Sequence, residues 1–260
     1  MVHSYHREKG VSRIAARMIR GVVGFLILVL VLLVLSAGIT VWMARPVAAA
    51  ICPSCFGFEH LQGQIFVQHG MTDKDKSKAT YLLIDAENRI KDFYGSVKYN
   101  PRVLVCVTSR CIRRLGGGGA DMGSIGPYVM LLSLQNVSVI DVSRLLALIE
   151  IQGRIGVRHM LMGSVPAWFE EGVAVLVSDD PQFIASPRGN RDRCLADPSD
   201  QLPVQMSDWN REAQEDSGLY ASSACRVYRW MLARGGSLAV TRLLAEIANG
   251  ESFNNAYNER

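Results

Sequence analysis

Three acidic side chains stand inside apolar stretches between Leu145 and Ser178. Glu150 interrupts the run LLALIEI, and Glu170 and Glu171 interrupt the run PAWFEEGVAVLV. A carboxylate is costly to bury unless another group pairs with it, and two carboxylates together can hold a hard cation weakly. These acids therefore either face solvent on ordinary amphipathic helices or form a buried chemical site.

The segment around the second pair of acids has the pattern of a known family. Residues 166–174 read Pro-Ala-Trp-Phe-Glu-Glu-Gly-Val-Ala, which resembles the P-x-W-x-x-E-G-x-A segment of gluzincin metallopeptidases, in the peptidase MA-like group. In that family it follows a helix with the pattern H-E-x-x-H, whose histidines bind zinc and whose glutamate is the general base. The resemblance places Glu150 at the base position and Glu171, 21 positions later, at the third zinc ligand.

Both histidine positions of that pattern hold other residues. Ile149 has no lone pair to donate, and Gly153 has no side chain and costs about 1 kcal/mol in a helix interior. His159 lies nine positions after Glu150 and cannot occupy the second position. Zinc prefers three protein ligands that include nitrogen or sulfur, and without zinc there is no activated water to deprotonate. The resemblance thus implies a peptidase fold, and the substitutions imply that zinc is not bound and that peptidase chemistry is lost.

Glu150 also has a structural interpretation. Arg154 follows it by four positions, so the two side chains can form an ion pair on one helix face and use the former base as a structural acid. The alternative is that Arg154, Arg158 and His159 form a solvated basic turn.

The resemblance implies a substrate groove as well. It places Trp168 and Glu170 in that groove, with Tyr220 facing it as a candidate catalytic residue. The strand from Met130 to Leu134 would be the edge strand that lines it. The alternative for Tyr220 is a packing residue at the start of a helix.

Hydrophobic periodicity and turn residues predict an α+β fold with a small mixed sheet and a mostly helical C-terminal half. The resemblance makes this a zincin-like domain over residues 63–260. A polar surface loop is expected over 179–208. Strands are expected over 64–68, 103–107 and 128–134. Helices are expected over 74–94, after a cap at Thr72 or Asp73, and over 220–233 and 238–249. A further helix, which carries Glu150, is expected to begin at a cap at Asp141 or Ser143.

The N-terminal residues suggest a membrane segment. Residues 1–20 form a basic tail, and residues 21–43 carry no charge. About 20 apolar residues span a bilayer, and the basic flank is expected in the cytoplasm. We therefore expect a transmembrane helix over 21–43, a linker over 44–62 and a single-pass membrane protein with an extracytoplasmic domain. A signal peptide cleaved near Ala48–Ala50 is the alternative.

The charge balance argues against a nucleic-acid partner. The chain carries a net charge of +4, and six basic residues against one acidic residue fall within residues 1–45. The remainder is therefore close to neutral, with no basic patch of the kind that nucleic acid requires. The apolar content of the full chain, 49%, permits a substantial core.

All six cysteines lie beyond residue 45, and an even number in an exported domain suggests disulfides. The alternatives are a redox-active or metal-binding C-x-x-C at Cys52–Cys55 and a four-cysteine zinc site. Six cysteines allow 15 connectivities, among which Cys52–Cys55, Cys106–Cys111 and Cys194–Cys225 are the candidate pairs.

Three functions remain compatible with these features. The first is a membrane-anchored pseudopeptidase that binds a peptide or a protein partner. The second is a structural envelope protein that uses the fold as a scaffold. The third is a residual metal-dependent peptidase with an unusual ligand set, such as Glu150, Glu171 and His159.

Overall fold

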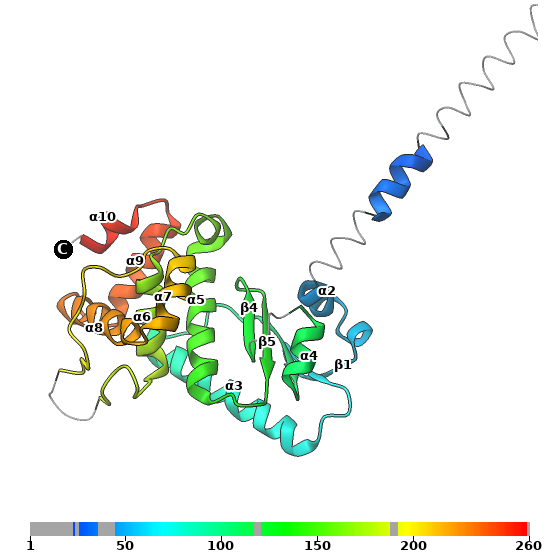
Figure 1. Cartoon of the computed structure of the whole chain (residues 1–260), viewed down its shortest axis with the longest axis horizontal. Coiled ribbons are helices and arrows are strands. Elements are labelled where there is room, and N and C mark those ends of the chain that lie inside the picture. The colour runs from blue at the N-terminus through cyan, green and yellow to red at the C-terminus, as the bar shows by residue number, and fades with distance from the viewer. Residues whose placement is uncertain (1–22, 24–25, 36–44, 117–120, 188–191, 259–260) are drawn as a thin grey trace, which may run out of the picture.

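The structure is a computed structural model that describes residues 23, 26–35, 45–116, 121–187 and 192–258. Strands occupy the first half of this range and helices the second (Figure 1). The strands are β1 (Phe58–Gln62), β2 (Ile65–Gln68), β3 (Arg102–Cys106), β4 (Met122–Ile125) and β5 (Val129–Ser133). The helices are α2 (Arg45–Ile51), the 3-10 helix η1 (Pro53–Phe56), α3 (Asp73–Tyr94), α4 (Ser109–Arg114), α5 (Val139–Leu161), α6 (Ala167–Ser178), α7 (Met206–Glu215), α8 (Gly218–Ala233), α9 (Leu238–Ala248) and α10 (Phe253–Asn258).

The strands of the described residues form one mixed sheet in the order β1-β2-β3-β5-β4. Strands β2, β3 and β5 are parallel, whereas β1 and β4 pair antiparallel to their neighbours at the two edges. The structure therefore confirms an α+β fold with a small mixed sheet.

The two faces of this sheet are covered by different helices. Side chains alternate along a strand, so Val103 and Val105 of β3 join the large core with α3 and α5. Leu104 and Cys106 point to the opposite face, where they pack in a smaller core with α2 and α4. Because both faces of the central strands are buried, these strands consist of continuous apolar runs.

Helix α3 has clear sequence signals at both ends. Its N-terminus is capped by Thr72, whose hydroxyl accepts a hydrogen bond from the backbone N–H of Asp75 at 3.2 Å. It ends at Gly95, which adopts the left-handed conformation (φ 76°) that glycine tolerates best. The predicted helix over 74–94 is therefore confirmed.

Helix α5 begins earlier than predicted and is bent near its end. Ser138 and Asp141 form a capping box, so the cap lies before the expected Asp141 or Ser143. Gly156 has non-helical angles (φ 82°, ψ 161°), which place a kink between the main body of the helix and residues 157–161. In Figure 1, α5 stands between the sheet and the C-terminal helices, and it packs on α3, α6 and α9.

The expected membrane helix is corrected by the structure. Within the described ranges no helix is long and apolar enough to cross a membrane. Of residues 21–43, the structure describes residue 23 and the helical residues 26–35. The single-pass topology built on that helix is therefore not supported. The predicted basic tail over 1–20 lies outside the described residues.

The predicted edge strand is also corrected. Residues 130–134 belong mostly to β5, which lies between β3 and β4 and has paired neighbours on both sides. The edge is β4, a four-residue strand with the sequence MGSI. Residues 44–62, predicted as a linker, hold α2, η1 and β1, and α2 packs on β3 and β5.

Candidate functional site

Glu150 is held by a dense set of hydrogen bonds. The residue is 1% exposed, and its Oε1 and Oε2 accept from the backbone N–H groups of Lys98 at 2.8 Å and Tyr99 at 3.0 Å. Arg154 donates to Oε1 from Nε at 2.9 Å and from Nη2 at 2.7 Å. The predicted ion pair of Glu150 with Arg154 is confirmed, and Glu150 is a structural carboxylate.

Arg154 extends this cluster to the segment that follows α3. Its Nη2 also donates to the carbonyl oxygen of Ser96 at 3.0 Å, and its guanidinium lies 4.7 Å from the centre of the Tyr94 ring. Together, Glu150 and Arg154 fasten residues 96–99 to the side of α5. A charged group with this many hydrogen bonds offsets much of its desolvation cost.

Ile149 and Gly153, which the resemblance aligns with the family's histidines, are both tightly packed. Ile149 is 1% exposed within the large core. At Gly153 the Tyr99 ring lies so close that an added Cβ would be 2.3 Å from its Cγ. A histidine at position 153 therefore has no space unless Tyr99 moves.

Glu171 has a different partner. Its Oε2 lies 3.3 Å from Nη2 of Arg144, and Nη1 of Arg144 lies 3.6 Å from Oδ2 of Asp180. Burial raises the pKa of Glu171, and the neighbouring Arg144 opposes that shift. Glu171 thus faces a guanidinium.

Arg144 also connects Glu171 to Tyr220. The guanidinium lies 4.4 Å from the centre of the Tyr220 ring, a cation–π arrangement. Tyr220 in turn packs against Phe183 and Trp209, with ring centres 5.0 and 5.1 Å away. The structure therefore brings the two predicted residues Tyr220 and Glu171 to one cluster, through an arginine that the sequence analysis did not identify.

Glu170 is buried beside this cluster without a charged partner. Burial raises its pKa to about 8, and the charge of Glu171 adds to the shift. Glu170 is therefore protonated at neutral pH. Burial also raises the pKa of Tyr94, on which Glu170, Glu150 and Arg154 all act electrostatically. Among the described residues, the buried Tyr94 hydroxyl has no hydrogen-bond partner.

The predicted groove residue Trp168 lies in an aromatic core. It is 5% exposed, and its ring meets those of Phe169, Phe253 and Tyr257 edge to face. The guanidinium of Arg226 covers it at 4.3 Å. In this position Trp168 stabilises the contact of α6 with α8 and α10 and does not present its ring to a ligand.

His159 is separated from the acidic residues by the kink in α5. Its Nδ1 lies 3.2 Å from the hydroxyl of Ser164. Among the described residues, no three His, Cys, Asp or Glu side chains form a group that could hold a metal ion. The alternative ligand set of Glu150, Glu171 and His159 is therefore not assembled.

All six cysteines lie in the described ranges, and they form the three predicted disulfides, Cys52–Cys55, Cys106–Cys111 and Cys194–Cys225. Because every thiol is paired, the structure does not form the alternative four-cysteine zinc site. The Cys52–Cys55 bridge lies at η1, between α2 and β1, and not after a strand as a redox C-x-x-C usually does.

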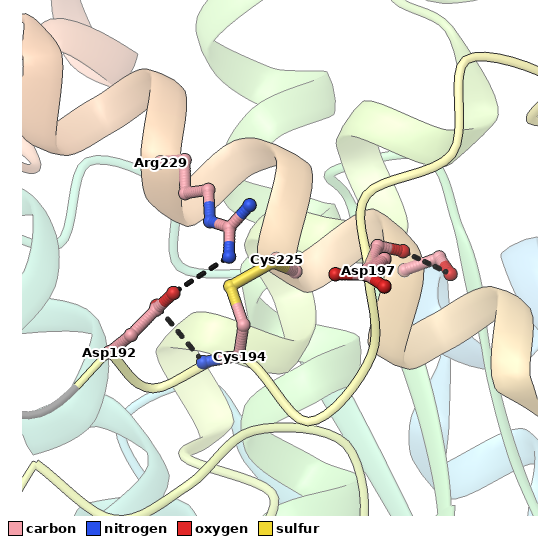
Figure 2. The surroundings of a disulfide bond; sticks show 6 residues. Asp192, Cys194, Asp197, Cys225 and Arg229 are labelled. Atoms are coloured by element: carbon pink, nitrogen blue, oxygen red, sulfur yellow. Dashed lines mark hydrogen bonds and ion pairs between the residues drawn. A yellow bond between two sulfur atoms is a disulfide. The ribbon is translucent and has the colours of Figure 1, made fainter.

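The third disulfide anchors the polar segment before α7, as Figure 2 shows. Cys194 on this segment is joined to Cys225 on α8. Asp192 reinforces the link, because it accepts hydrogen bonds from Arg229 at 2.7 Å and from the backbone N–H of Cys194 at 3.2 Å. The predicted surface loop is therefore tied to the helical half.

Two residues of these clusters were not predicted. Arg144 stands in the apolar run VSRLLAL, and a basic residue inside such a run is a signal that could have suggested an acidic partner. Tyr99 reaches Gly153 from 54 positions away, and no local pattern indicates that contact.

Comparisons of the chain with family models, with curated proteins and with solved structures find no match.

Proposed function

We propose that the chain is an inactive relative of the gluzincin metallopeptidases that acts by binding an extended peptide or protein segment. The observation that supports the loss of catalytic activity is the environment of Glu150. A general base must be able to reach a water or substrate proton. This carboxylate instead accepts hydrogen bonds from Arg154 and from two backbone N–H groups, and it is 1% exposed.

The neighbouring positions support the same conclusion. Ile149 and Gly153 offer no donor atoms, and the Tyr99 ring occupies the space beside Gly153. At the third ligand position, Glu171 faces the guanidinium of Arg144. A fixed positive charge there satisfies the carboxylate without a metal, and a guanidinium cannot activate water as zinc does.

The exposed edge of the sheet supports the binding role. Asp121 accepts a hydrogen bond from Ser133 of β5, and in an antiparallel pair the residues that bond the neighbour alternate along the strand. Met122 and Ser124 therefore direct their backbone groups away from β5. An extended peptide can add to such an edge as a further strand.

Apolar side chains surround the turn at the end of that edge. Ile125 and Tyr128 are 36% and 61% exposed, and Leu161 and Met162 at the end of α5 are 77% and 67% exposed. The end of α5 approaches this turn, since an added Cβ at Gly126 would lie 3.2 Å from the sulfur of Met160. Apolar side chains of a bound peptide would find contacts here that water does not provide.

The first experiment is a zinc titration of the full chain, purified with its disulfides intact, together with a cleavage assay on a mixed peptide library. We expect zinc to bind no more tightly than about micromolar and no peptide to be cleaved. One tightly bound zinc per chain with peptide cleavage would overturn the inactive assignment.

The second experiment tests the edge strand directly. Peptides selected on the wild-type chain by phage display are titrated against Ser124→Pro, which removes an outward N–H from β4, and against Ser124→Thr, which keeps it. We expect Ser124→Pro to weaken binding by about tenfold or more, whereas Ser124→Thr binds as the wild type does. Equal binding by the two variants would contradict strand addition at β4.

A further inference from the structure

A second candidate site lies near β1 and β2, at the opposite edge of the sheet from β4. A cavity of about 310 Å³ is enclosed by α3, α5, the turn between β1 and β2, and residues 97–101. This volume is at the lower end of the range for small-molecule sites. Its buried walls are apolar and include Leu83, Ile90, Val103 and Leu146.

The polar groups of the cavity are at its mouth and on the α5 wall. Gln62, Gln64 and Asn100 are exposed side chains that line the mouth, so a ligand can enter from solvent. On the α5 wall is Glu150, whose Oε1 accepts from Arg154 and Lys98. Its Oε2 accepts from Tyr99, so this carboxylate is already satisfied by the protein.

Glu87 is the lining carboxylate that remains available to a ligand. Glu150 also lines the cavity but is neutralised by Arg154 at 2.7 Å, and none of the described lining residues is Lys or Arg. Glu87 is only loosely paired, with Lys91 Nζ at 3.4 Å and both side chains substantially exposed. A ligand with a negative group would be repelled here, whereas a ligand with an amine would be attracted.

We propose that this cavity binds a small apolar amine, with its hydrocarbon or aromatic part against the buried walls and its amine directed toward Glu87. The apolar walls bind the body of the ligand through removal of its surface from water. The Glu87 carboxylate then selects for a hydrogen-bond donor of positive charge. The site uses β2 and α3, so it is independent of the peptide edge at β4.

A matched pair of probes tests the charge preference. Tryptamine and indole-3-propionate share an aromatic body and a two-carbon chain but end in an amine and a carboxylate, respectively. Each is titrated into the full chain with its disulfides intact by isothermal calorimetry. We expect tryptamine to bind with a Kd of about 1 mM or below, and at least about tenfold more tightly than indole-3-propionate. Equal binding of the two, or no binding of tryptamine at ~1 mM, would overturn the proposal.

Variants locate the binding to this cavity. Ile84→Trp places a larger side chain at the mouth, at a residue that is 50% exposed and so tolerates the change, and we expect it to abolish tryptamine binding. Tyr81→Trp is the matched control, since Tyr81 is on the same helix, is 62% exposed and is not part of the cavity lining.

Glu87→Gln is expected to reduce the preference for the amine. Unchanged tryptamine binding by Ile84→Trp would contradict the site, and Ser124→Pro should leave tryptamine binding unaltered whether or not the peptide proposal holds.

Discussion

Two arginine–glutamate pairs involve helix α5, and they differ in how completely the carboxylate is satisfied. Glu150 and Arg154 are on the same helix, their side chains are 2% and 8% exposed, and the shortest contact is 2.7 Å. Glu171 and Arg144 are on different helices, their side chains are 11% and 19% exposed, and their contact is 3.3 Å. In the first pair, two backbone N–H groups also donate to Glu150. In the second pair, Arg144 interacts with Asp180 as well as with Glu171.

The difference follows from where each partner lies in the chain. A helix places residues four apart on one face, so Arg154 reaches Glu150 within α5. Glu171 needs a partner from another helix, and its pKa remains raised by burial. The Glu150 carboxylate is therefore part of the core, while Glu171 is the less satisfied of the two.

The largest effect is expected from breaking the first pair. Arg154→Ala leaves Glu150 buried with only backbone donors, and we expect a loss of about 3–5 kcal/mol in the free energy of unfolding. Arg144→Ala is the matched variant at the second pair. It should cost less, about 1–3 kcal/mol, because Glu171 and Asp180 are left with more exposure and a raised pKa permits protonation. Urea denaturation at pH 7 measures both, and a larger loss for Arg144→Ala would contradict the comparison.

The next effect concerns the space beside Glu150. Gly153→Ala would place a Cβ 2.3 Å from the Tyr99 ring, and we expect a net loss of about 1–3 kcal/mol from overpacking. Gly123→Ala is the control, because an added Cβ there meets nothing within 4 Å. It should change stability by no more than about 0.5 kcal/mol. A stabilising effect of Gly153→Ala, as expected from helix propensity alone, would show that Tyr99 does not fill this site.

Glu170, the neighbour of Glu171 in the second pair, makes the free energy of unfolding depend on pH. Its usual pKa is 4.5 and burial raises it to about 8, so between these values the folded chain holds a proton that the unfolded chain releases. Stability from this group is therefore complete below pH 4.5 and falls as pH rises toward 8, by at most about 1.4 kcal/mol per pH unit. Glu170→Gln should flatten this part of the profile, measured by urea denaturation from pH 5 to 8.5. An unchanged slope in Glu170→Gln would contradict the buried neutral acid.

The smallest effect is expected from a change at the start of α5, which lies closer to Arg144 than to Glu150. Ser138→Ala removes the capping hydroxyl that accepts from Asp141, and we expect a loss of about 1 kcal/mol. Arg144 lies within two turns of this end, whereas Glu150 lies farther along the helix. Amide hydrogen exchange should therefore accelerate near Arg144 more than near Glu150. Equal acceleration at both places would show that α5 responds as one unit.

Several sequence predictions hold because they depend on neighbours in the chain. Thr72 and Gly95 bound α3 through local hydrogen bonds and a local backbone conformation. Arg154 reaches Glu150 because the helix repeat places them together. The Cys106–Cys111 bridge closes over five positions.

Other predictions were wrong or incomplete because their signals are weak or ambiguous. The resemblance to the peptidase family predicts the edge strand at 130–134, but these residues belong mostly to β5, which is paired on both sides. The uncharged run over 21–43 indicates a spanning helix from composition alone, whereas no helix of the described residues is long and apolar enough to cross a membrane. Trp168 carries a motif position of the resembling family, yet it lies in the aromatic core with Phe253 and Tyr257.

The sequence by itself therefore determined the acids at Glu150 and Glu171, the absence of histidine at positions 149 and 153, and the local pairing of Glu150 with Arg154. Only the tertiary structure decided that the Tyr99 ring fills the space at Gly153 and that Arg144 faces Glu171. The physical reason is that a helix repeat specifies contacts within a few residues, whereas contacts between distant segments depend on how whole elements pack.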